Sequence, residues 1–116
     1  MRTSKAYFER FKAEFLRWQK ELGLTQYRIL FCHEKLEDDC AKIIIGQMDK
    51  LAKVILSTEL PGTEKEDEGP ESHAKHEAIH LLESRLAWLG ACRYIEESDL
   101  NEECEAVVVR LEKVLK

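Results

Sequence analysis

Two short runs of β-branched residues limit most strongly what this chain can fold into. They are CAKIIIGQM at residues 40–48 and LAKVILSTE at residues 51–59, and only Asp49 and Lys50 separate them. β-Branched residues favour strands, and a short polar turn between two such runs is typical of a β-hairpin. We therefore expect an antiparallel pair of strands in the middle of the chain.

A third strand is predicted just before the hairpin. In residues 26–34 large apolar side chains alternate with other residues, so that Tyr27, Ile29 and Phe31 share one side. This alternation is typical of a strand with one buried face. Together the three runs predict a small, mostly antiparallel sheet of three strands.

Helical patterns precede and follow the predicted strands in the sequence. From Ser4 to Leu22 large apolar residues recur at steps of three and four, which predicts an amphipathic helix that ends at Gly23. A polar loop at residues 60–72, which contains both prolines, follows the hairpin. A second helix is expected from about residue 70 to the low 90s. The residues that it should direct inward are Ala74, Ile79, Leu82, Leu86 and Leu89.

A last helix is predicted near the end of the sequence. Asp99 is followed three residues later by Glu102, which is the pattern of a capping box. The expected apolar stripe comprises Leu100, Cys104, Val107, Val108, Leu111 and Val114 or Leu115. The predicted order is helix, three strands, helix and helix, which indicates a single α+β domain over residues 1–116.

Length and charge narrow the classes of function. The chain has 116 residues, of which 44% are hydrophobic, and this is enough for one core. Its net charge is −5, and acidic and basic residues are interspersed. We therefore expect neither nucleic acid nor a membrane as a partner. No apolar run approaches the roughly 20 residues that cross a bilayer.

Four cysteines bear on the compartment. They stand at positions 32, 40, 92 and 104, and none forms a C-x-x-C pair. The chain opens with MRTSKAYFER, without an apolar signal region. We expect free thiols and a cytoplasmic protein; the alternative is a secreted protein with two disulfides.

The most informative motif is H-E-x-x-H, formed by His76, Glu77 and His80 within the second predicted helix. Two histidines four residues apart on a helix point the same way and can bind one zinc ion. Glu77 projects from the neighbouring flank, where it can act as the general base for a metal-activated water. The alternative is a histidine pair that only forms hydrogen bonds within the fold.

A catalytic zinc ion needs a third protein ligand. No histidine follows His80, so we expect a carboxylate from further along the chain. Glu83 is excluded because it lies about two turns beyond His76, a span of roughly 10 Å. Glu103 is the preferred ligand because it shares the apolar side of the last helix. The other candidates are Glu102, Glu105 and, less favoured, Cys104.

His76, Glu77 and His80, followed by a helical glutamate, resemble the gluzincin metallopeptidases. The order of the predicted elements is similar to that of minigluzincins, including short metallopeptidase-like proteins of phages and prophages. The resemblance implies a zincin-like fold, one Zn²⁺ per chain and hydrolysis of peptide bonds. It also implies a bacterial cell or a phage-infected host as the source.

The same resemblance implies where a peptide substrate would bind. It identifies the strand at Leu51 to Thr58 as the sheet edge to which an extended peptide would add. Arg93, Tyr94 and His33 are available to stabilise an oxyanion, and the sequence does not choose among them.

Two other functions fit the same residues. One is a zincin-like module that binds a partner through the sheet edge, with structural zinc or none, and does not catalyse. The other is a metal-free structural protein. The acidic run at residues 64–68 is expected to be a solvated loop.

Overall fold

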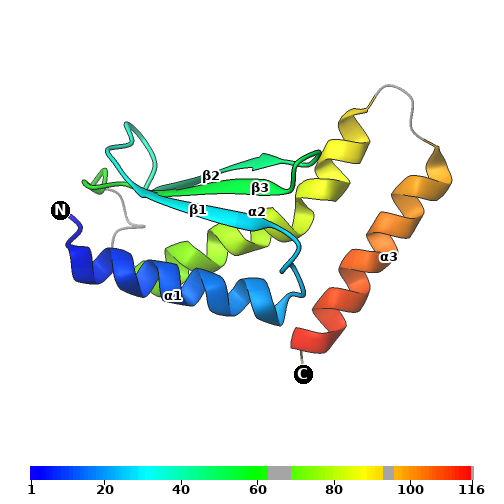
Figure 1. The fold of residues 1–116 in the computed structure, drawn as a ribbon, viewed down its shortest axis with the longest axis horizontal. Coiled ribbons are helices and arrows are strands. Elements are labelled where there is room, and N and C mark those ends of the chain that lie inside the picture. Colours follow the sequence, from blue (N-terminus) through cyan, green and yellow to red (C-terminus); the bar gives the residue numbers. More distant parts are fainter. Residues whose placement is uncertain (63–68, 93–95, 116) are drawn as a thin grey trace.

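The computed structural model describes residues 1–62, 69–92 and 96–115, which form three helices and a three-stranded sheet. In chain order the elements are α1 (Lys5–Glu21), β1 (Arg28–His33), β2 (Ala41–Gly46), β3 (Leu51–Leu56), α2 (Gly69–Ala91) and α3 (Glu97–Val114). Their order and type confirm the predicted small α+β domain. Figure 1 shows the sheet beside α1 and α2, with α3 at one end of the molecule.

The sheet is mixed, and its strand order is β1-β3-β2. The hairpin prediction is confirmed, since β2 and β3 are antiparallel and Ile43 lies opposite Val54. The prediction of a mostly antiparallel sheet is wrong, because β1 pairs with β3 in parallel. The prediction of an edge at Leu51 to Thr58 is also wrong. β3 is the central strand of the described sheet, and β1 and β2 form its edges.

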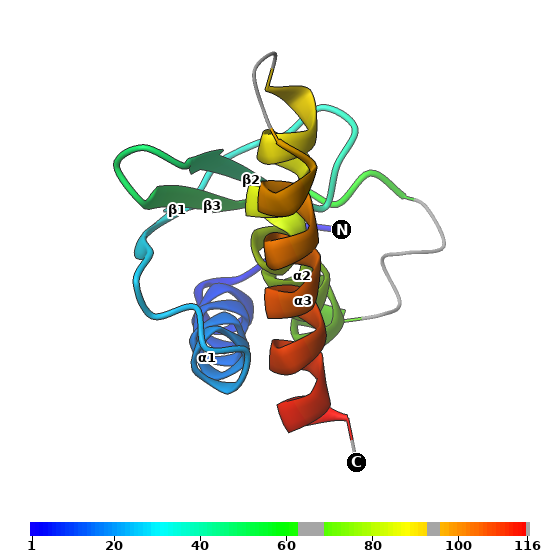
Figure 2. The same cartoon turned by 90° about the vertical axis from the view of Figure 1, so that its right-hand side faces the viewer.

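One face of the sheet packs on α1 and α2, and Figures 1 and 2 agree on this arrangement. Phe11 and Phe15 of α1 are completely buried there, as are Val54 and Leu56 of β3. Gly23 follows the C-cap of α1 and has a positive φ of 68°, so the helix stops there as predicted. On the opposite face, Leu30 and Ile44 of the two edge strands are about half exposed.

A buried chain of hydrogen bonds connects the sheet to α2. The Tyr27 hydroxyl donates to Oε1 of Gln47 over 2.9 Å, and the Gln47 amide donates to the Ser84 hydroxyl over 2.8 Å. Ser84 in turn donates to the Leu81 carbonyl within α2. Gln47 lies directly after β2, so this chain sets the position of the hairpin relative to α2.

The second helix agrees closely with its predicted span. Ala74, Leu82 and Leu89 are buried as expected. Ile79 was expected to point inward, but it is 48% exposed. The reason is that α1, the sheet and α3 contact other parts of the α2 surface, and Ile79 lies outside these contacts.

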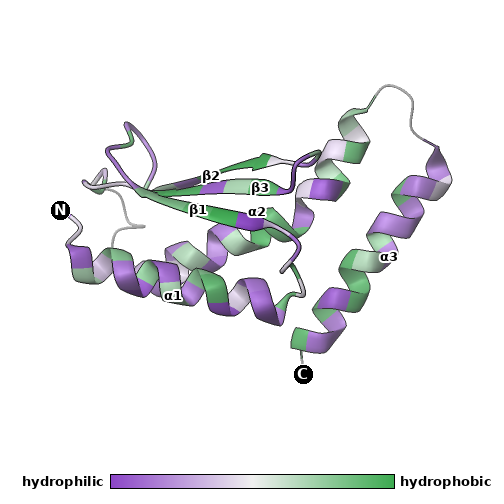
Figure 3. Ribbon diagram, viewed as in Figure 1, coloured by the Kyte–Doolittle hydropathy of each residue, from purple (hydrophilic) through white to green (hydrophobic). Residues whose placement is uncertain are grey.

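The third helix is the least buried of the three. It begins at Glu97 with Glu96 as its N-cap, and no side chain caps it, so the capping box predicted at Asp99 is wrong. Val107, Leu111 and Val114 pack against the core. Cys104 and Val108 are exposed, contrary to prediction. Figure 3 shows hydrophilic and hydrophobic residues along both α1 and α3, as in amphipathic helices.

Candidate metal centre

The two histidines of the H-E-x-x-H motif meet on the surface of α2. Nε2 of His76 and Nε2 of His80 lie 3.1 Å apart, and the two rings are nearly perpendicular. Two nitrogens that bind one tetrahedral zinc ion at about 2.0–2.1 Å would lie roughly 3.3 Å from each other. The pair therefore has the spacing of two ligands of one metal ion.

Glu83 orients one of these rings. Its Oε1 lies 2.9 Å from Nδ1 of His80. When Nδ1 carries the proton and donates it to this carboxylate, Nε2 of the neutral ring keeps its lone pair for a metal. Histidine ligands of metals commonly have such a carboxylate partner.

Glu77, between the two histidines in the motif, is only 5% exposed. Burial raises its pKa above the ordinary value of 4.5. Nearby His80 lowers the pKa of Glu77, and Asp39 raises it. The same α2 turn thus places two exposed imidazoles beside one buried carboxyl group, which can exchange a proton with a molecule bound in front of it.

A cleft of about 440 Å³ lies between α2 and β2. Its lining from β2 and the loop before it includes Asp39, Ala41, Ile43 and Ile45. The lining from α2 includes His76, Glu77, His80, Glu83 and Ser84. Because β2 is an edge strand, the histidines and Glu77 lie beside a strand that can pair with an added chain.

The structure does not bring the predicted third ligand to the histidines. Glu103 pairs instead with Arg85, whose Nε lies 3.4 Å from its Oε2. Glu103 lines a different cavity, which shares no residue with the cleft. Glu102 and Glu105 line a groove against the end of α1. Among residues 1–62, 69–92 and 96–115, no three His, Cys, Asp or Glu side chains are grouped closely enough to hold a metal ion.

The residues considered for the oxyanion role are not in the cleft or are not described. Arg93 and Tyr94 lie outside the described residues, as does the acidic run at 64–68. His33 lies at the end of β1, where its Nε2 is 2.6 Å from the Thr3 hydroxyl and its ring stacks on Phe8. His33 therefore packs against Thr3 and Phe8 near the N-terminus of the chain, and it does not line the cleft.

Two residues of the site were not identified from the sequence. Glu83 was considered only as a ligand and excluded, although its spacing of three residues from His80 places the two side chains together on a helix. Asp39 lines the cleft from the loop before β2. No local pattern marks Asp39, because its position depends on how the sheet packs on α2.

Comparisons with known proteins add no relative. No family model, curated protein or solved structure matches this chain. Within the described part of the chain, none of the helices is both long enough and apolar enough to span a membrane. Cys32, Cys92 and Cys104 are free thiols.

Proposed function

We propose that this chain is a small zinc-dependent metallopeptidase of gluzincin type. His76 and His80 would hold one Zn²⁺, and Glu77 would act as the general base in peptide hydrolysis. The observation that carries the proposal is the 3.1 Å separation of the two Nε2 atoms beside a buried carboxyl group in a cleft. A cytoplasmic location and a zincin-like relationship are parts of the same proposal.

The third ligand would be a carboxylate, and two residues are considered. Asp39 already lines the cleft that contains both histidines. Glu103, the ligand predicted from the sequence, would first have to leave Arg85, and the first turns of α3 would have to approach the cleft. Both are oxygen donors that suit zinc.

Bound zinc would supply a Lewis acid that polarises the scissile carbonyl and activates water. Glu77 would accept the proton of the attacking water and pass it to the nitrogen of the leaving amine as the peptide bond breaks. Glu83 would hold His80 in the tautomer that leaves Nε2 free. The free edge of β2 would bind the substrate as an added strand.

Metal content measured by mass spectrometry on purified protein tests the ligands. We expect one zinc per chain in the wild type and loss of zinc in His76→Ala and His80→Ala. Asp39→Asn and Glu103→Gln, compared side by side, identify the third ligand. Glu83→Gln should weaken zinc binding roughly 10- to 100-fold. Glu112→Gln, at an exposed position of α3, is the matched control.

Cleavage of a peptide library tests the chemistry. Glu77→Gln should abolish cleavage and leave zinc content unchanged, because Glu77 is assigned to the proton transfer and not to the metal. If zinc is lost together with activity, the role assigned to Glu77 is wrong. Wild-type protein that takes up no zinc would overturn the proposal.

A second function is favoured by one observation, the absence of a third ligand next to the histidines among the described residues. The domain would then bind an extended peptide along β2 without cleaving it. In that case peptide binding would persist in His76→Ala and Glu77→Gln, and the wild type would show no cleavage in the presence of zinc.

A further inference from the structure

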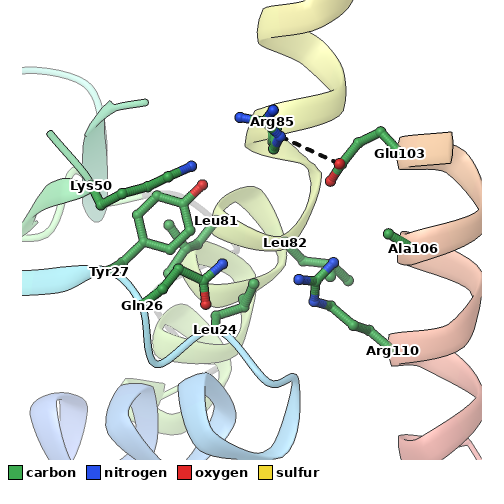
Figure 4. A pocket seen from close by; sticks show the side chains of 10 residues that line it. All are labelled: Leu24, Gln26, Tyr27, Lys50, Leu81, Leu82, Arg85, Glu103, Ala106 and Arg110. Carbon is green, nitrogen blue, oxygen red and sulfur yellow. Dashed lines mark ion pairs between the residues drawn. The ribbon is translucent and has the colours of Figure 1, made fainter. Parts of the chain in front are cut away.

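A second cavity lies on another side of α2, between that helix, α3 and the β2–β3 turn. It has a volume of about 220 Å³. Leu24, Leu81 and Leu82 form an apolar part of its wall, and Gln26 and Tyr27 lie beside them. Figure 4 shows these side chains together around one space. The cavity shares no residue with the cleft that contains the histidines.

Three cationic side chains reach this cavity from three different elements. Lys50 comes from the β2–β3 turn, Arg85 from α2 and Arg110 from α3. Among the residues that the structure describes, Glu103 is the only acidic one in the lining. The site is therefore positive in a chain whose net charge is −5. Three like charges around one small space repel each other unless an anion lies between them.

The existing contacts leave most of these cations available. Arg85 is 3.4 Å from Glu103, which is longer than a good hydrogen bond. The Lys50 ammonium lies over the Tyr27 ring, 5.1 Å from its centre. Among the residues that the structure describes, neither Lys50 nor Arg110 has a carboxylate within ion-pair distance. The guanidinium groups can thus turn donors toward a bound ligand.

From these features we propose that this cavity binds a phosphate group, either as inorganic phosphate or as the end of a small phosphate monoester. Arginine forms paired hydrogen bonds to phosphate oxygens, and a phosphate monoester carries close to two negative charges at neutral pH. That charge balances the excess of cations over Glu103, whereas a single carboxylate would not. The volume equals that of roughly seven water molecules, so a phosphate with a short organic stem fits.

NMR titration of ¹⁵N-labelled protein with inorganic phosphate, and separately with O-phosphoserine, tests the proposal. We expect saturable chemical-shift changes of the backbone amides of Lys50, Arg85 and Arg110. Tighter binding of inorganic phosphate identifies the free ion as the ligand, and tighter binding of O-phosphoserine identifies a monoester. Both probes are used without added metal, so the result is independent of the metallopeptidase proposal.

Two variants with opposite expected effects sharpen the test. Arg110→Gln should weaken binding roughly ten-fold or more, since it removes charged hydrogen bonds. Glu103→Gln should strengthen binding, because it removes the carboxylate that competes for Arg85. Lys113→Gln is the matched control, since it makes the same charge change on the same helix outside this cavity.

The proposal fails if phosphate produces no saturable shifts, or if the shifts are spread over the basic residues of the whole surface. It also fails if Lys113→Gln weakens binding as much as Arg110→Gln, because that result would indicate general charge screening. Circular dichroism of each variant establishes that the fold is retained before binding is compared.

Discussion

At the scale of single residues, Glu77 is a carboxyl group held in an environment that disfavours its charge. Its side chain is almost buried, and burial raises its pKa. The folded protein therefore binds the Glu77 proton more tightly than the unfolded chain does. By linkage, the stabilising contribution of this proton is complete below the unfolded pKa of 4.5 and is lost as the pH rises through the folded pKa.

This argument predicts how Glu77→Gln changes stability in the presence of a chelator. The difference in free energy of unfolding, variant minus wild type, should increase as the pH is raised from 4.5 through the folded pKa of Glu77. Urea unfolding at a series of pH values measures this difference. His80 and Asp39 also face Glu77, and comparing the two proteins at each pH cancels most of their own effects. A constant difference across this range would contradict the prediction.

At the scale of elements, the chain of hydrogen bonds through Gln47 connects the hairpin to α2. Gln47→Ala would leave the Tyr27 hydroxyl and the Ser84 hydroxyl without one partner each in a mostly buried region. We expect the free energy of unfolding to fall by about 1–3 kcal/mol. Thermal or urea unfolding measures this loss.

The exposed variant Gln26→Ala is a suitable comparison for Gln47→Ala, since the wild-type side chain is the same. Gln26→Ala should change stability much less. Equal losses in both variants would show that the buried hydrogen bonds do not hold the hairpin.

The sequence predicted the elements better than the way in which they pair. The hairpin was predicted from two adjacent β-branched runs that are separated by a polar turn at Asp49 and Lys50. This pattern is local, so the sequence was enough to indicate it. The parallel pairing of β1 with β3 joins residues that are far apart in the chain, such as Phe31 and Val54, and no local pattern specifies it. The error in the edge strand followed from this.

In the candidate site, too, the sequence predicted what depends on one helix and not what depends on the packing of distant segments. The convergence of His76 and His80 follows from the geometry of one helix and was predicted. The positions of Asp39 and Glu103 depend on how a loop and α3 pack against α2, and periodicity does not determine this packing. The predicted capping box at Asp99 is wrong because α3 begins earlier, at Glu97.

At the scale of the whole molecule, stability is unevenly distributed. Eight residues of α2 are buried, whereas no residue of α3 is. Segments with few buried contacts open at lower free energy than the core does. We expect backbone amides of α3 to exchange with deuterium before those of α2.

Hydrogen exchange followed by mass spectrometry on the intact chain measures this difference. Peptides from residues 97–114 should gain deuterium earlier than peptides from residues 74–89. Exchange of both helices at one common rate would indicate that the domain opens only as a single unit. Added phosphate should slow exchange in α3 if the cavity beside Arg110 binds it.

The strand order also determines the sequence of events by which the chain can reach this structure. The β2–β3 hairpin closes a short loop and can form early, because the entropy lost in closing a loop increases with its length. β1 cannot take its place until β3 is present, since β3 is the strand with which it pairs. The nascent chain would thus leave the ribosome with β1 unpaired. The edge of the sheet that β1 forms would be completed only after β3 has been synthesised.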